Sequence, residues 1–166
     1  MRSIEVPEEV YELISAIARR KAKSVEEVIL EYVTKDVDPN VRIEVYTKLH
    51  EKYLKDAEEL YAKGDLAQAG EKYWGAVTAL LNAVGERRGW SHYTHRDYAE
   101  IVERLSEELK QPLGRLFASV ERLHANYYSF LTKVNFEAHR EDALKLIQNS
   151  EAFNDQFDTS SSVQRG

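Results

Sequence analysis

The chain has 166 residues, of which 43% are hydrophobic and 31% charged, and its formal net charge is −6. This composition supports one buried core with or without a small appended module, and it excludes a membrane protein, because no run approaches the roughly 20 apolar residues of a membrane-spanning helix. The lack of cysteine excludes disulfides, thiol catalysis and cysteine-based zinc sites. The N-terminus has no signal-peptide pattern, and together with the lack of cysteine this predicts a cytoplasmic protein.

Residues 1–37 predict a short extended segment followed by two helices. Residues 3–6 are the extended segment, Pro7 and the acidic residues after it open the first helix, and Ser24 with Glu27 forms a capping box for the second. This order resembles the ribbon-helix-helix modules of bacterial and archaeal repressors and antitoxins. The resemblance implies pairing of two chains through their N-terminal strands, with Ser3 and Glu5 facing DNA.

The charge of this segment favours a different role. Residues 1–35 hold six basic and seven acidic side chains, a net charge of −1. A DNA-reading module is expected to be clearly positive, because neutralising phosphates supplies most of its affinity. The sequence therefore favours a dimerising or packing element, and DNA reading stays the alternative.

The rest of the chain predicts helix after helix. Pro39 lies in a linker, Gly64 and Asp65 form a tight turn between two helices, and Pro112 marks a later break. Apolar residues at helical spacing predict helices over 41–63, 66–88, 94–109, 113–131 and 136–153, the second of them central. We expect an all-α protein with an N-terminal arm over 1–37, a bundle over 40–153 and a disordered tail over 154–166.

Two short motifs carry a family resemblance. The run Trp74-Gly75-Ala76 and the run Leu123-His124-Ala125-Asn126 resemble the archaeal PaREP family over about residues 41–153. That family is grouped with the HEPN-like bundles, so the resemblance implies an antiparallel bundle of about five helices. Many HEPN proteins are ribonucleases and toxins paired with antitoxins, and their motif is an arginine with a histidine four to six positions later. Here Arg122 precedes His124 at the wrong distance for that motif.

His124 is the leading candidate site residue because it interrupts an apolar stripe. Glu121 lies one turn earlier, and a Glu-x-x-His pair is half of a di-iron carboxylate signature. No second pair exists, so we expect no metal and no cofactor. His124 is either a general base with Glu121 or Arg122, or a structural histidine bonded to Glu121, Tyr127 or a backbone carbonyl.

A second candidate cluster interleaves basic and aromatic residues before a helix N-terminus. This composition is typical of a phosphate or single-stranded nucleic-acid contact, and also of a solvated loop. Its candidate binding residues are Arg87, Arg88, Trp90, His92, His95 and Arg96.

These observations predict a non-catalytic binding or regulatory protein rather than an enzyme. We expect a homo-oligomer, a dimer in the simplest case, with a protein or nucleic-acid partner and a toxin–antitoxin-like role. The alternatives are a divergent HEPN-type ribonuclease using His124, and a small-molecule or nucleotide sensor with a closed cavity beside Trp74 and His124.

Overall fold

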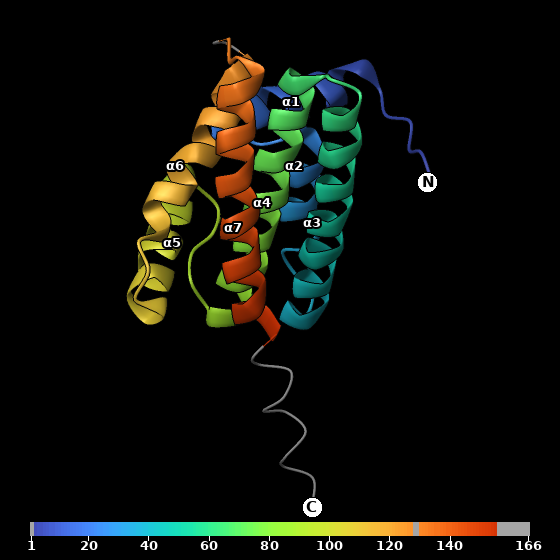
Figure 1. Cartoon of the computed structure of the whole chain (residues 1–166). Helices are drawn as coiled ribbons and strands as arrows, with labels where there is room; N and C mark the ends of the chain where they lie inside the picture. The colour runs from blue at the N-terminus through green and yellow to red at the C-terminus, as the bar shows by residue number, and fades with distance from the viewer. Residues whose placement is uncertain (1, 128–129, 156–166) are drawn as a thin grey trace, which may run out of the picture. The chain divides into compact units, whose positions relative to one another are not determined.

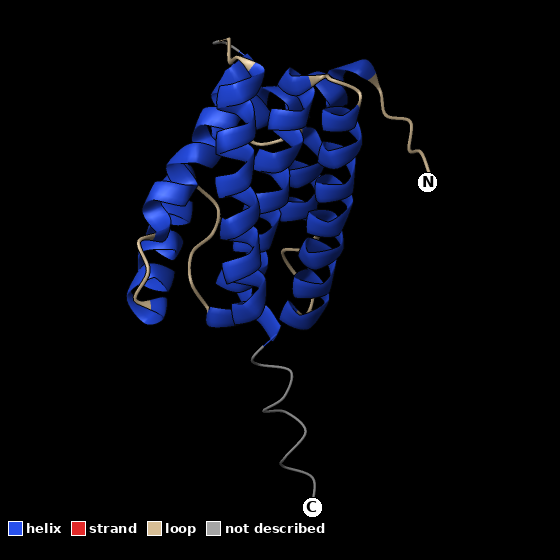
Figure 2. Cartoon of the chain, in the orientation of Figure 1, coloured by secondary structure: helices blue, strands red, loops and turns tan. Residues whose placement is uncertain are grey.

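The computed structural model describes residues 2–127 and 130–155, and no strand occurs among them (Figure 2). The all-α prediction is thereby confirmed. The chain divides into two compact units, residues 1–38 and 39–166. The helices are α1 Glu8–Lys21, α2 Val25–Val33, α3 Pro39–Ala62, α4 Leu66–Arg88, α5 His95–Leu109, α6 Leu113–His124, a 3-10 turn Ala125–Tyr127, and α7 Lys133–Asp155.

The first unit consists of α1 and α2. The capping box of α2 is confirmed: Ser24 Oγ accepts from the Glu27 backbone N–H at 3.1 Å, and the Glu27 side chain accepts from the Ser24 N–H at 2.7 Å. The strand predicted for residues 3–6 does not form. A strand needs a second strand for its backbone hydrogen bonds, and none lies beside these residues in the described chain.

The second unit is built around α4, as its apolar surface on two sides predicts. Its residues from Ala76 to Gly85 are all buried, and α4 contacts α3, α5, α6 and α7 (Figure 1). The turn between α3 and α4 is the predicted one: Gly64 has a φ of +80°, and the Asp65 side chain accepts from the backbone N–H of Gln68.

α4 approaches its neighbours closely because two glycines face them. A Cβ on Gly70 would overlap the carbonyl oxygen of Leu123 in α6, and a Cβ on Gly75 would lie 3.0 Å from the Tyr53 ring of α3. These small residues therefore set the spacing between the helices.

α6 is shorter than its apolar stripe predicts. The helix ends at His124. Beyond it, the side-chain Oδ1 of Asn126 accepts a hydrogen bond from the backbone N–H of Leu131 at 2.8 Å. This side-chain hydrogen bond replaces a helical one and stabilises the turn into α7. The prediction of one helix through Leu131 is wrong for that reason.

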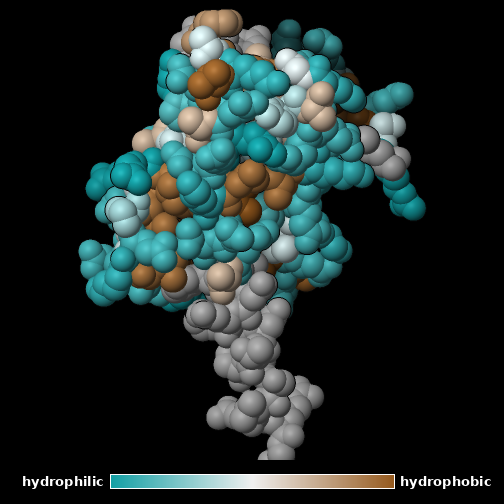
Figure 3. Space-filling view, viewed as in Figure 1, coloured by the Kyte–Doolittle hydropathy of each residue, from teal (hydrophilic) through white to brown (hydrophobic). Residues whose placement is uncertain are grey.

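The predicted disordered tail lies outside the described residues from residue 156 onward. Among the residues that are described, none of the helices combines the length and the apolar character needed to cross a bilayer. The face in Figure 3 is mostly hydrophilic, with several hydrophobic patches.

Candidate functional site

The structure brings two candidate histidines from different helices to one tryptophan. The His124 ring of α6 is stacked on the Trp74 ring of α4, with centroids 4.8 Å apart and an interplanar angle of 20°. The His95 ring at the start of α5 is stacked on the same indole at 5.6 Å and 19°. Phe117 and Tyr98 also contact Trp74, which is only 5% exposed. We call Trp74, His95 and His124 the indole cluster.

Each histidine of the indole cluster is held by a carboxylate from another helix. His124 donates from Nδ1 to Oε2 of Glu71 in α4 at 3.2 Å, and Oε1 of the same carboxylate lies 3.0 Å from that nitrogen. His95 Nε2 lies 2.9 Å from Oε1 of Glu121. Glu121, one of the partners predicted for His124, lies on α6 with it but pairs with His95 of α5, and the partner of His124 comes from α4.

The indole cluster keeps part of a general-base arrangement. A carboxylate on one ring nitrogen fixes the tautomer, which leaves the other nitrogen of a neutral imidazole as an acceptor. The His124 side chain is 34% exposed, so solvent reaches the residue. Arg122 lies in the last turn of α6 and is half-buried.

A metal centre is not formed by these residues. No three His, Asp or Glu side chains in the described part of the chain come together as a metal site would require. Glu121 and His124 do not face a common site, because Glu121 pairs with His95 and His124 pairs with Glu71. The two residues therefore resemble a di-iron half-site only in their spacing along the sequence.

The predicted anion cluster is divided by the fold. Arg88 pairs with Glu108 of α5 at 3.1 Å, and its guanidinium lies 5.3 Å from the Trp90 ring centre. Arg104 of α5 lies over the same ring at 5.1 Å. Trp90 thus packs against two arginines, of which only Arg88 belongs to the predicted cluster. Arg87, another member of that cluster, lies in the last turn of α4.

His92 is not available to a ligand at the surface. Its side chain is 3% exposed, and Nε2 donates to Oε2 of Glu86 at 2.7 Å. Glu86 also accepts from Arg42 at the start of α3, so one carboxylate joins α3, α4 and the loop before α5. The three residues form a buried structural network.

The helix N-terminus expected to attract an anion is closed by the chain's own residues. Asp97 accepts from the backbone N–H groups of Tyr93 and Thr94, both at 2.9 Å. Burial alone raises the pKa of Asp97, but these hydrogen bonds and one from Ser91 outweigh it, so the pKa lies below its usual value. Arg96, in the same turn, pairs with Glu100 at 3.0 Å.

A group of hydrolase-type residues that sequence reasoning missed lies between α6 and α7. Ser119 Oγ donates to Asp142 Oδ2 at 2.7 Å and lies 3.1 Å from His139 Nδ1. In a hydrolytic triad the histidine stands between serine and aspartate, whereas here the serine does. Ser119 is also inside α6 and 7% exposed, so the group is an inter-helix contact.

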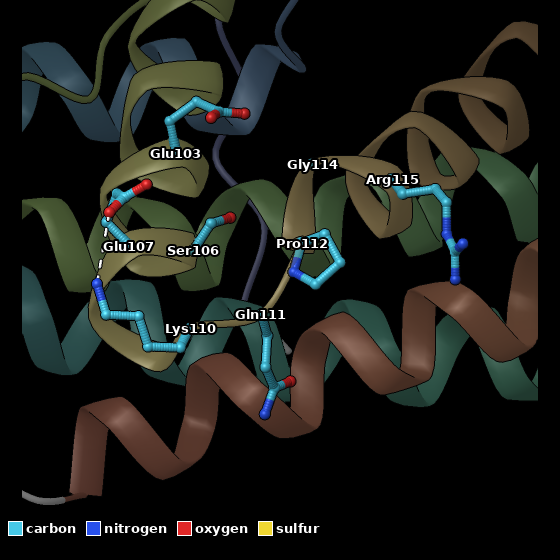
Figure 4. A pocket seen from close by; sticks show the side chains of 8 residues that line it. All are labelled: Glu103, Ser106, Glu107, Lys110, Gln111, Pro112, Gly114 and Arg115. Carbon is cyan, nitrogen blue, oxygen red and sulfur yellow. Dashed lines mark ion pairs between the residues drawn. The ribbon is translucent and has the colours of Figure 1, made fainter.

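A pocket of about 600 Å³ opens at the turn between α5 and α6 (Figure 4). Lys110 and Glu107 pair at its edge, 3.6 Å apart. This pocket is not the predicted sensor cavity, which is expected beside Trp74 and His124. At that place the rings of His95, Phe117 and His124 pack on the indole of Trp74. The residues that line the open pocket are Glu103, Ser106, Glu107, Lys110, Gln111, Pro112, Gly114 and Arg115.

The chain matches the model of a known protein family. The model of the archaeal PaREP1/PaREP8 family matches residues 45–147, well over half of the chain. No curated protein and no solved structure matches it. The matched range contains the indole cluster and both motifs of the resemblance, so the chain belongs to the archaeal PaREP1/PaREP8 family.

Proposed function

We propose that this protein is a binding or regulatory module that acts through a protein partner, as one half of a toxin–antitoxin-like pair does. The observation that supports this is the use of the candidate side chains inside the fold. Glu71, Glu86 and Glu121 each hold a histidine from another segment of the bundle. Side chains used in this way stabilise helix packing and are less free to act on a substrate.

A protein partner is favoured over a nucleic acid by charge. The net charge of the chain is −6, and the cations Arg88 and Arg96 of the predicted anion cluster are each paired with a glutamate. Nucleic-acid affinity depends on cations that can neutralise phosphates. Association with nucleic acid is therefore proposed only through the partner.

The test is fluorescence anisotropy of labelled single-stranded RNA and duplex DNA with the purified chain at 50 and 200 mM salt. We expect no binding at micromolar protein at either salt concentration. Arg88→Ala and Arg96→Ala should leave this result unchanged. Tight binding that weakens steeply with salt, and that Arg88→Ala reduces, contradicts the proposal.

A divergent ribonuclease using His124 is the second candidate. The observation that favours it is the carboxylate-held imidazole of His124, which is partly exposed and stacks on the same indole as a second imidazole, that of His95. General acid–base cleavage of RNA uses one group to take the 2′-hydroxyl proton and another to protonate the leaving oxygen.

Incubation of metal-free protein with RNA distinguishes the two candidates. The binding proposal predicts intact RNA for the wild type and for His124→Gln. The ribonuclease candidate predicts cleavage that His124→Gln abolishes while the folded structure, monitored by circular dichroism, is kept. Cleavage that survives in His124→Gln indicates a contaminating nuclease and counts against the second candidate.

We also propose the finer architecture that the resemblance implies. The bundle formed by α3 to α7 is proposed to be HEPN-like, residues 1–37 are proposed to be ribbon-helix-helix-like, and the lack of cysteine fits a cytoplasmic protein. An experimental structure whose helices superpose on a HEPN bundle supports the first of these, and a different helix order removes it.

A further inference from the structure

The first unit leaves apolar side chains exposed in all three of its segments. These are positions that helical or strand spacing assigns to an interior. Exposed fractions are 89% for Ile4, 63% for Leu13 and 70% for Val33. A unit of 38 residues with two helices is below the size at which a chain builds a sufficient core by itself. The exposed side chains therefore need a covering surface.

α1 carries one outward stripe in which two apolar residues lie between an acidic and a basic residue. Glu9, Leu13, Ala16 and Arg20 recur at intervals of four, three and four residues, so they lie on one face of the helix, and all four are exposed. The stripe is acidic at one end, basic at the other and apolar in the middle. It is about 16 Å long from Glu9 to Arg20 at 1.5 Å per residue.

Such a stripe is complementary to itself in the antiparallel direction. When two copies of α1 cross at the midpoint between Leu13 and Ala16, Glu9 of each copy lies beside Arg20 of the other. Leu13 of each then packs against Ala16, whose small side chain permits close approach. Within the described residues neither Glu9 nor Arg20 forms an ion pair, so both are available. A two-fold contact of this kind uses the same surface on both chains.

We propose that α1 is a self-association surface on which the α1 helix of a second copy of this chain docks antiparallel. This goes beyond the proposed binding of a protein partner, because it assigns the contact with a second copy of the chain to one helix of the first unit. The charges select this occupant. A parallel copy would place Glu9 beside Glu9 and Arg20 beside Arg20, and those like charges repel.

Charge reversal on the full-length chain tests the proposal by sedimentation equilibrium over a range of concentrations. The wild type should be a dimer. Glu9→Arg and Arg20→Glu should each weaken dimerisation by roughly tenfold or more, because each replaces two symmetry-related attractions by repulsions. The double variant Glu9→Arg/Arg20→Glu should restore dimerisation to near the wild-type level, since it exchanges the two ends of the stripe.

Glu8→Arg is the matched control. This variant makes the same charge change at the preceding residue. Glu8 is also exposed and in the first turn, but its side chain lies about 100° around the helix from that of Glu9. It should leave the dimer unchanged, and circular dichroism should show equal helicity in all variants. A wild type that is monomeric at every concentration overturns the proposal. A dimer indifferent to both single reversals, or one that the double variant does not restore, overturns it as well.

Discussion

At the scale of the single residue, the histidines show how this chain uses groups that elsewhere do chemistry. Each of the five has a polar partner contributed by another segment of the bundle. A buried imidazole without such a partner costs free energy, so the contacts of the two buried histidines, His50 and His92, stabilise the fold. The pairs are His50 with the carbonyl of Ala76 and with Glu151, His92 with Glu86, His95 with Glu121, His124 with Glu71, and His139 with Ser119.

Asp97 gives a prediction at this scale. Asp97→Ala removes the capping box of α5 and should lower the free energy of unfolding by about 1 kcal/mol at pH 7. The folded-state pKa of Asp97 is depressed, so its contribution is full above the unfolded-state pKa of about 4 and is lost as the pH falls through the folded value. Urea unfolding should therefore show a smaller difference between the two proteins at pH 3 than at pH 7.

Glu100→Ala is the control for that experiment, since its pair with Arg96 lies at the surface of the same helix. It should change the free energy of unfolding by less than about 0.5 kcal/mol at either pH. An Asp97→Ala effect no larger than that of Glu100→Ala would contradict the role of the cap.

Local contacts were predictable from the sequence, whereas partners across the bundle were not. The caps at Ser24 and Thr94 follow from residues three positions apart, and both are present. Glu71 lies 53 positions from His124, so nothing in the local spacing identifies it as the partner. The one sequence feature that could have pointed to Glu71 is its position one helical turn before Trp74 in α4.

At the scale of the element, helix boundaries marked by a capping residue were predictable, whereas the end of α6 at His124 and the start of α7 at Lys133 were not. α4 begins and ends where Asp65 and Gly89 predict, because each residue determines the backbone directly. The end of α6 depends on the Asn126 side chain reaching Leu131, and apolar spacing continues beyond it. Apolar periodicity reports which face is buried, and it does not report where backbone hydrogen bonds change.

Gly70 tests the packing of α4 against α6. Gly70→Ala gains helix propensity of about 1 kcal/mol but places a methyl group against the backbone of Leu123, which cannot move without shifting α6. We expect a net loss of about 1–3 kcal/mol in the free energy of unfolding, measured by urea denaturation.

Gly114→Ala is the comparison, because the nearest atom to its Cβ is the end of the flexible Glu103 side chain at 3.0 Å. That variant should be neutral or slightly more stable. Equal effects of the two substitutions would show that α4 and α6 are not in the close contact described.

At the scale of the whole molecule, polar contacts join helices that are far apart in the sequence. Tyr73 of α4 donates to Glu58 of α3 at 2.5 Å and accepts from Arg140 of α7 at 2.6 Å. Burial, with the neighbouring Glu58 carboxylate, raises the pKa of Tyr73 far above its usual value, so the hydroxyl stays a donor at physiological pH. We expect contacts of this kind to favour unfolding of the bundle as one unit.

The central claim is that the candidate catalytic side chains hold helices together, and the pair of Glu71 and His124 tests it most directly. The measurement is a double-mutant cycle of Glu71→Gln, His124→Gln and the double variant in global urea unfolding at pH 7. The pair is partly exposed, so we predict a stabilising coupling free energy of about 0.2–1 kcal/mol. A coupling of zero, together with single variants as stable as the wild type, would contradict the claim.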